Sequence, residues 1–174
     1  GGQTYAVTEI GDNAMAGNNT VTKISIPDTV ESIGKNAFKK CKKLKTVTIP
    51  KNVSTVGSGA FKDCTSLTTV KYAGGNVKAV AADTFSGCTK LTNVTLSSGT
   101  TSIEKNAFKK CKKLKKITIP KKVTKIASNA FADCTGLKTI TIKSTKLKTI
   151  GKNAFKNVSK KAVVKVPKKQ KKTY

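Results

Sequence analysis

KNAFKKCKKLKTVTIP, residues 35–50, returns at residues 105–120 as KNAFKKCKKLKKITIP, with two changes in sixteen positions. Both stretches belong to a longer series, because all six phenylalanines of the chain lie 23 or 24 residues apart. These are Phe38, Phe61, Phe85, Phe108, Phe131 and Phe155. A fixed period of this length is the signature of stacked repeats. The repeat therefore decides the architecture before any local prediction is made.

Each unit surrounds its phenylalanine with the same apolar positions. An alanine or another small residue precedes it, an aliphatic residue lies five positions before it, and cysteine and leucine follow at three and six positions. The cysteines are Cys41, Cys64, Cys88, Cys111 and Cys134. One unit is too short to bury its own apolar side chains, so the units must stack and share a core. We predict a repeat solenoid of about seven units.

Local patterns predict the elements within a unit. Leu44–Pro50 alternates apolar and polar residues as a major strand does, with Thr48 pointing outward and Pro50 ending the strand. Val30–Ile33 predicts a short second strand with its two terminal residues inside. Residues 35–41 predict a single helical or 3-10 turn, which would put the alanine, phenylalanine and cysteine on one inward side.

The repeated pattern I-x-x-x-A-F-x-x-C-x-x-L-x-x-V-x-I-P resembles the BspA-like leucine-rich repeat, and the resemblance covers residues 7–167. Met15 and Asn18 replace phenylalanine and cysteine in the first unit, while Val158 and Lys161 replace cysteine and leucine in the last. Atypical end units are expected in a stack. The resemblance implies a right-handed, β-rich leucine-rich-repeat stack. It also implies a bacterial cell-surface or secreted protein, often an adhesive one.

We expect one leucine-rich-repeat domain over residues 1–174. It would comprise an atypical unit at 1–27, regular repeats at 28–157, and a C-terminal cap and basic tail at 158–174, the last of which either caps the stack or leads to a further domain. No run of about eighteen apolar residues occurs, so we expect no membrane span. A signal peptide is absent, and we expect that one has been removed.

The cysteines do not fit a zinc site, because they are widely spaced and the chain has no histidine. Stacking would bring neighbouring cysteines within disulfide range but with parallel Cβ vectors, which disfavours bonding. We predict five reduced thiols that fill a buried row. We also expect no cofactor and no metal.

Catalysis is not expected either. A cysteine nucleophile needs a base, commonly histidine. The eight acidic residues are scattered over turns and strand flanks of different units, and Glu31 and Glu104 are too far apart to act as a pair.

The composition is unusual in its charge, because the chain contains 35 lysines and only eight acidic residues, which gives a formal net charge of +27. Because apolar core positions interrupt the lysine runs, the lysines of the second and fifth units should point outward as a basic ridge, the polyanion ridge. Its members are Lys39, Lys40, Lys42, Lys43, Lys109, Lys110, Lys112 and Lys113. The ridge either keeps the stack soluble or attracts polyanions such as teichoic acid and acidic glycans. With no arginine or tryptophan and all phenylalanines in the core, we do not expect dedicated nucleic-acid recognition.

A second candidate surface is the row at the centre of the major strands, the strand-centre face. It comprises Ser25, Thr48, Lys71, Thr95, Thr118, Thr141 and Lys165. The row either makes weak polar contacts with a ligand or is only a β-favouring ladder.

Together with the resemblance, these features favour a non-catalytic binding or adhesion module at the cell surface or outside the cell, with a host protein, glycan or wall polymer as ligand. The alternative is a basic repeat protein that binds polyanions or nucleic acid.

Overall fold

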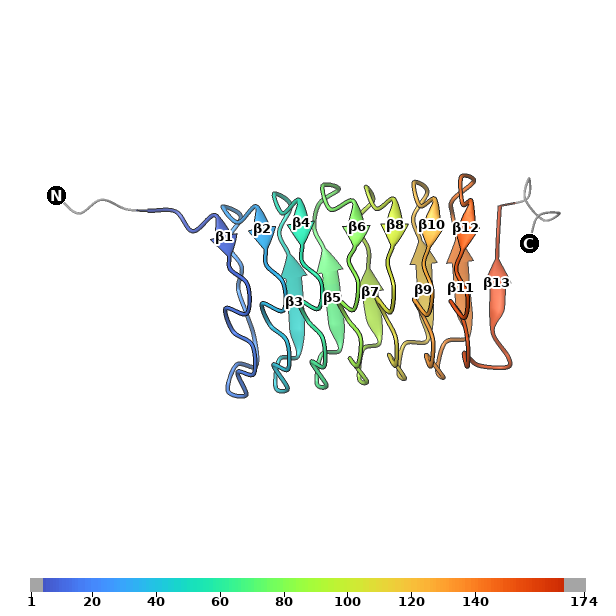
Figure 1. Ribbon diagram of the computed structural model, residues 1–174, viewed down its shortest axis with the longest axis horizontal. Coiled ribbons are helices and arrows are strands. Elements are labelled where there is room, and N and C mark those ends of the chain that lie inside the picture. The colour runs from blue at the N-terminus through green and yellow to red at the C-terminus, as the bar shows by residue number, and fades with distance from the viewer. Residues whose placement is uncertain (1–4, 168–174) are drawn as a thin grey trace.

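The computed structural model describes residues 5–167 and shows an elongated parallel β-solenoid of about seven turns (Figure 1). The major strands are β3 (Thr46–Ile49), β5 (Thr69–Tyr72), β7 (Asn93–Thr95), β9 (Lys116–Ile119), β11 (Thr139–Ile142) and β13 (Val163–Lys165). The minor strands are β1 (Glu9–Ile10), β2 (Ser32–Ile33), β4 (Thr55–Val56), β6 (Ala79–Val80), β8 (Ser102–Ile103), β10 (Lys125–Ile126) and β12 (Thr149–Ile150). The basic tail predicted to cap the stack lies largely outside the described residues.

Equivalent residues of successive coils pair in parallel register, as Val47 with Val70 and Ile117 with Ile140. Every position of the repeat therefore becomes a row along the solenoid. The predicted alternation is confirmed in β3, where Val47 and Ile49 are buried and Thr48 is exposed. Pro50 follows the strand directly.

Both sheets are interrupted once. The minor strands form the groups β1-β2-β4 and β6-β8-β10-β12, and the major strands form β3-β5-β7 and β9-β11-β13. Wider spacings between β4 and β6 and between β7 and β9 are visible in Figure 1. The second strand of each unit is also shorter than predicted: only Ser32–Ile33 pairs within Val30–Ile33, although Val30 and Ile33 are both buried.

The segment predicted as a helical or 3-10 turn is instead a series of β-turns, so that prediction is wrong. Some amides close local turns, as when Lys39 N donates to Asn36 O at 3.0 Å. The amides between them reach the next coil, as when Phe38 N donates to Ala60 O at 2.8 Å. A helix would use these amides internally and leave the coils unlinked.

The series of β-turns depends on a left-handed backbone conformation at two positions of each unit. Two residues before the phenylalanine φ is positive at Asn13, Asn36, Gly59, Asp83, Asn106, Asn129 and Asn153. Two residues after it φ is positive at Gly17, Lys40, Asp63, Gly87, Lys110, Asp133 and Asn157. Glycine, asparagine and aspartate tolerate this conformation. Lys40 and Lys110 do not share that tolerance, and their φ values are 60° and 63°.

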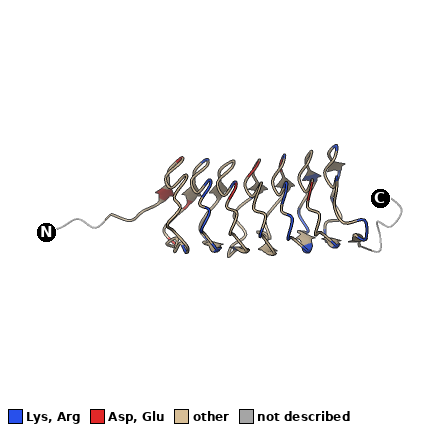
Figure 2. Cartoon of the chain, turned by 90° about the horizontal axis from the view of Figure 1, so that it is seen from below, with Lys and Arg blue, Asp and Glu red and all other residues tan. Residues whose placement is uncertain are grey.

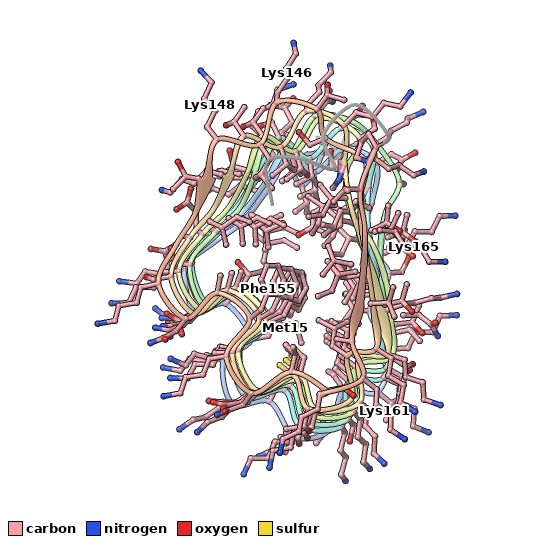
Figure 3. The ribbon with its side chains drawn as sticks, turned by 90° about the vertical axis from the view of Figure 1, so that its right-hand side faces the viewer. Met15, Lys146, Lys148, Phe155, Lys161 and Lys165 are labelled. Atoms are coloured by element: carbon pink, nitrogen blue, oxygen red, sulfur yellow. The ribbon has the colours of Figure 1, made fainter. Side chains whose placement is uncertain are left out.

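A stack of aromatic rings fills the centre of the core. Neighbouring phenylalanine rings lie 5.2–5.6 Å apart between centroids, with interplanar angles of 3–18°. Seen from the C-terminal end, Met15 and Phe155 project into the middle of the section (Figure 3). The six rings belong to six consecutive coils, so the aromatic stack runs through most of the solenoid.

We predict that Lys110→Gly stabilises the protein by about 0.5–1 kcal/mol, because glycine removes the Cβ that crowds a left-handed residue. Urea unfolding followed by circular dichroism measures the change. Lys112→Gly is the matched control, since φ is not positive at Lys112. That variant should be neutral or destabilised, and equal stabilisation in both variants would contradict the strain argument.

Candidate functional site

The structure aligns members of the strand-centre face within each of the two major sheets. Thr48, Lys71 and Thr95 are register partners in one sheet, and Thr118, Thr141 and Lys165 in the other. Ser25 precedes them beside the isolated bridge between Lys23 and Thr46. All seven side chains are exposed except that of Thr141, which is half-buried.

The face is interrupted where β7 and β9 fail to pair. Val94 of β7 is half-buried, whereas its equivalents Val70 and Ile117 are only 1% and 2% exposed. Opening the ladder thus brings a core side chain toward solvent. Sequence reasoning missed this feature.

The loop after β7 departs from the repeat in the same region. A Cβ on Gly99 would overlap the carbonyl oxygen of Gly75, so the loops of these two coils approach more closely than side chains allow. On the other side of Gly99, no hydrogen bond joins residues 96–100 to residues 120–123. The loop of this coil thus lies against the loop of the preceding coil at Gly75.

Two polar groups lie inside the core of these coils. Tyr72 takes the position of Ile49 and Thr100 that of Val53, and the Tyr72 and Thr100 hydroxyls are buried without a hydrogen-bond partner among the described residues. Burial raises the pKa of Tyr72 above its ordinary value. The sequence signal for this irregular region was the loss of the Ile-Pro pair at residues 72–73 and 96–97.

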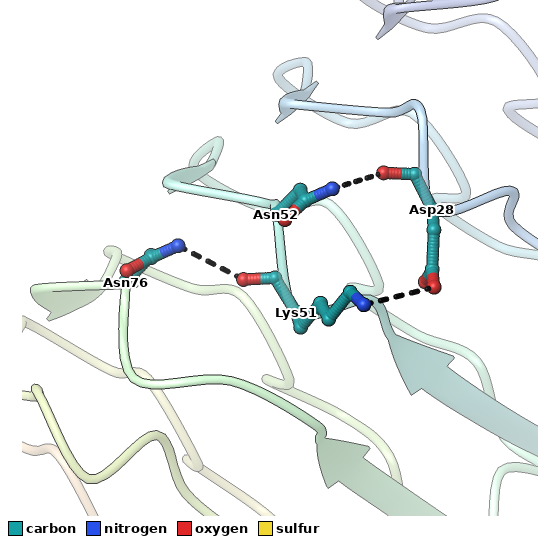
Figure 4. Close-up of polar contacts among 4 residues, drawn as sticks. All are labelled: Asp28, Lys51, Asn52 and Asn76. Atoms are coloured by element: carbon teal, nitrogen blue, oxygen red, sulfur yellow. Dashed lines mark hydrogen bonds and ion pairs between the residues drawn. The ribbon is translucent and has the colours of Figure 1, made fainter.

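Side chains link the loops of the first coils (Figure 4). Asn52 Nδ2 donates to Asp28 O at 2.7 Å, and Asn76 Nδ2 donates to Lys51 O at 2.9 Å. Lys51 Nζ lies 3.9 Å from Asp28 Oδ2. These contacts end at the coil of Asn76, one coil before the interrupted ladder.

A cleft of about 610 Å³ lies at the interruption, and we call it the β7–β9 cleft. Val94, Leu96 and Pro120 supply its apolar lining. Its polar lining consists of Thr95, Ser98, Thr118, Lys121, Lys122 and Lys143. Thr95 and Thr118 belong to the strand-centre face, so the cleft is a hollow in that face.

The polyanion ridge is divided into two groups. Six of its eight lysines are exposed, whereas Lys39 and Lys109 are half-buried. Lys39 and Lys109 each follow the phenylalanine of their unit. This position faces partly inward, because Ser86 and Ala132, which occupy it in other units, are buried. Two coils separate the groups, and Asp63 lies in the first of these coils. The ridge as a continuous binding surface stays a prediction.

Positive charge is concentrated toward the C-terminal end of the solenoid (Figure 2). Residues 105–174 contain 23 lysines and a single acidic residue, Asp133, whereas residues 1–104 contain 12 lysines and seven acidic residues. The β7–β9 cleft lies where the strongly basic part of the chain begins. Its basic side chains come from that part.

Several acidic side chains have structural partners in neighbouring coils. Asp12 accepts a hydrogen bond from Lys35 N at 2.6 Å, and Lys125 Nζ donates to Glu104 at 2.9 Å. Partial burial opposes ionisation of Glu104, but the hydrogen bonds from Lys125 and Ser102, together with the charge of Lys125, outweigh it and lower the pKa of Glu104. Within residues 5–167, no group of three or more histidine, cysteine, aspartate or glutamate side chains could hold a metal ion.

Residues 8–134 and 73–173 match the model of the BspA type leucine rich repeat region, with six copies. This chain belongs to the BspA-type leucine-rich repeat family. No curated protein matches it. In the part of this BspA-type chain that the structure describes, no helix is long and apolar enough to cross a membrane.

Solved structures of bacterial leucine-rich repeat proteins resemble this BspA-type solenoid. A protein from Eubacterium ventriosum has a TM-score of 0.81 at 30% identity, over 94% of this chain and 45% of its own. One from Bacteroides ovatus has a TM-score of 0.79 at 29% identity, over 92% and 46%. A leucine rich cell surface protein from Faecalibacterium prausnitzii has a TM-score of 0.59 at 36% identity, over 83% and 45%. The chain thus spans less than half the length of these proteins.

The cysteines of the BspA-type units are free and buried, which confirms the prediction. The structure adds that each thiol donates to a carbonyl of the preceding coil, as Cys64 Sγ does to Phe38 O at 3.0 Å. All five of these bonds measure 3.0–3.2 Å. Burial raises the pKa of Cys64 to about 12 and also raises the pKa values of Cys41, Cys88 and Cys111.

We predict that the free energy of unfolding falls between pH 9 and 12 because of Cys64. Below pH 9 this thiol is neutral in both states, whereas between pH 9 and its folded pKa of about 12 only the unfolded chain ionises it. Ionisation then favours the unfolded state. Urea unfolding across this range measures the loss.

Cys64→Ala is the control, because lysine titration affects both proteins equally and cancels in the comparison. The variant should lose stability less steeply with pH. Identical slopes would contradict the thiol argument. In parallel, iodoacetamide should label five cysteines only after denaturation, and a disulfide in the peptide map would contradict reduced thiols.

For the polyanion ridge, we predict that changing its eight lysines to glutamine abolishes retention on heparin. Retention of the wild type should fall steeply once salt exceeds physiological strength, where the Debye length is about 8 Å. Heparin, single-stranded DNA and teichoic acid columns should release the wild type at similar salt. Retention of the substituted protein, with an unchanged circular dichroism spectrum, would place the attraction elsewhere.

Proposed function

We propose that this chain is a non-catalytic binding module of a bacterial cell-surface or secreted protein, and that it binds its ligand on the strand-centre face. The observation that supports the proposal is the register of the major strands, in which Thr48, Lys71 and Thr95 form one outward row and Thr118, Thr141 and Lys165 form a second. A rigid row of this kind presents repeated polar groups at fixed spacing. Repeat proteins use such extended surfaces for binding.

Two further facts support this proposal. The acidic side chains of Asp12, Asp83 and Glu104 are engaged in contacts between coils and are not gathered in a pocket. The similar protein from Faecalibacterium prausnitzii is described as a leucine rich cell surface protein. Host proteins, glycans and wall polymers are the ligand classes that fit an exposed polar face.

Polyanion binding is the second candidate function, and the charge distribution favours it. Twenty-three of the 35 lysines lie within residues 105–174. A dense cationic surface attracts polyanions without regard to their chemistry. Strong salt dependence and weak discrimination would distinguish this function from recognition on the strand-centre face.

A glycan and protein array at physiological salt tests the proposal. Any ligand that it identifies should bind Thr48→Gln/Thr118→Gln at least about tenfold more weakly, because two long side chains then obstruct the face. The matched control is Thr55→Gln/Thr149→Gln, which makes the same change on exposed positions of β4 and β12. This control should bind like the wild type. Equal loss in both variants, or ligands that dissociate only with salt, would contradict recognition by the strand-centre face.

A further inference from the structure

We propose that the β7–β9 cleft binds an extended acidic peptide segment. This inference rests on the proposed function, because it names a ligand class for the hollow within the strand-centre face. Three properties of the cleft carry it: open strand edges, a partly exposed apolar lining, and lysines that no acidic side chain neutralises.

The open edges come from the interrupted ladder. β7 pairs with β5 and β9 pairs with β11, and no bridge joins β7 to β9 within residues 5–167. Backbone N–H and C=O groups on the facing edges therefore lack the strand partner that their equivalents have elsewhere in the sheet. Such groups need hydrogen bonds from water or from a ligand. Because Cα atoms of β7 and β9 approach within 8 Å, a peptide would reach these groups with polar atoms from the cleft and would not insert as a strand between them.

The apolar lining provides a place for aliphatic side chains. Val94 is half-buried although the same position is buried in the neighbouring coils. Leu96 and Pro120 flank it in the cleft. A small apolar surface inside a strongly charged one is typical of a ligand site. Because no aromatic side chain lines the cleft, a sugar ring would find no surface on which to stack.

The charges select an acidic ligand. Lys121, Lys122 and Lys143 are exposed, and none of them takes part in the three ion pairs found among the described residues. No acidic side chain lines the cleft. Carboxylates of a bound segment would meet uncompensated ammonium groups. The net charge of +27 also opposes a second copy of this chain as the occupant.

A fluorescein-labelled, C-terminally amidated hexapeptide of alternating glutamate and valine serves as the probe in fluorescence anisotropy at physiological salt. The variant Lys121→Gln/Lys122→Gln/Lys143→Gln should bind it at least about tenfold more weakly than the wild type. The matched control, Lys35→Gln/Lys105→Gln/Lys152→Gln, removes three charges from exposed positions outside both the cleft and the polyanion ridge. It should bind within about twofold of the wild type. Equal weakening of both variants, or no binding by the wild type, would overturn the proposal.

A second probe tests the apolar lining. Replacing the three valines of the peptide by serine keeps its charge, and it should weaken binding about fivefold or more because aliphatic burial is lost. Equal affinity for both peptides would mean that charge alone holds the ligand, and would overturn a specific cleft. Direct binding of heparin that is lost in the cleft-lysine variant, while neither peptide binds, would assign the cleft to anionic glycans and also overturn the proposal.

The two proposals fail separately. An array ligand that is lost in a Thr48→Gln variant, which changes a position outside the cleft, but unaffected by the cleft-lysine variant would support the strand-centre face and contradict a peptide cleft. Peptide binding that depends on the cleft lysines, without any array ligand that depends on Thr48, would support the cleft and contradict binding along the whole face.

Discussion

The hydrogen bond between equivalent backbone groups of successive coils is the interaction on which this structure depends. A single coil buries too little apolar surface to fold alone, and a backbone linked only to itself could not hold the next coil in register. Near each phenylalanine, successive backbone amides alternate between two kinds of hydrogen bond. The amide of Lys39 closes a local turn, and the amide of Phe38 bonds to the neighbouring coil, so the segment is folded locally and also holds the coils in register. Ring stacking, the thiol row and the strand-centre face all follow from the register that these bonds impose.

Much of this register could be predicted from the sequence, because residues that recur at a fixed interval in the chain form one row along the solenoid. Phe38 and its equivalents stack, the cysteines are buried thiols, and Thr48 points outward as the alternation predicted. The turn was predicted wrongly because the quoted units contain lysine at positions 40 and 110. Asparagine, aspartate and glycine occupy the left-handed positions elsewhere, and that periodic set was the available signal.

The β7–β9 cleft could not be predicted in the same way, because it arises where individual units depart from the repeat pattern. Gly75 and Gly99 bring two loops together, Thr100 replaces a core valine, and the loss of pairing appears one coil later. Each departure is visible in the sequence as a missing Ile-Pro pair or an added glycine. Their combined effect depends on how neighbouring coils share space, which no single unit encodes. The lysine content of the sequence likewise does not indicate which lysines line the β7–β9 cleft.

The two interruptions of the sheets fall at different junctions, and this offset has a mechanical consequence. Between the coils of Phe61 and Phe85 the minor ladder is open while β5 still pairs with β7. Between the coils of Phe85 and Phe108 the major ladder is open while β6 still pairs with β8. Each junction therefore keeps one ladder and also the hydrogen bonds of the turn segments, as from Phe61 N to Thr84 O and from Phe85 N to Ala107 O. A ligand in the cleft would link the two halves of the major sheet, β3-β5-β7 and β9-β11-β13, at the junction where the major ladder is open.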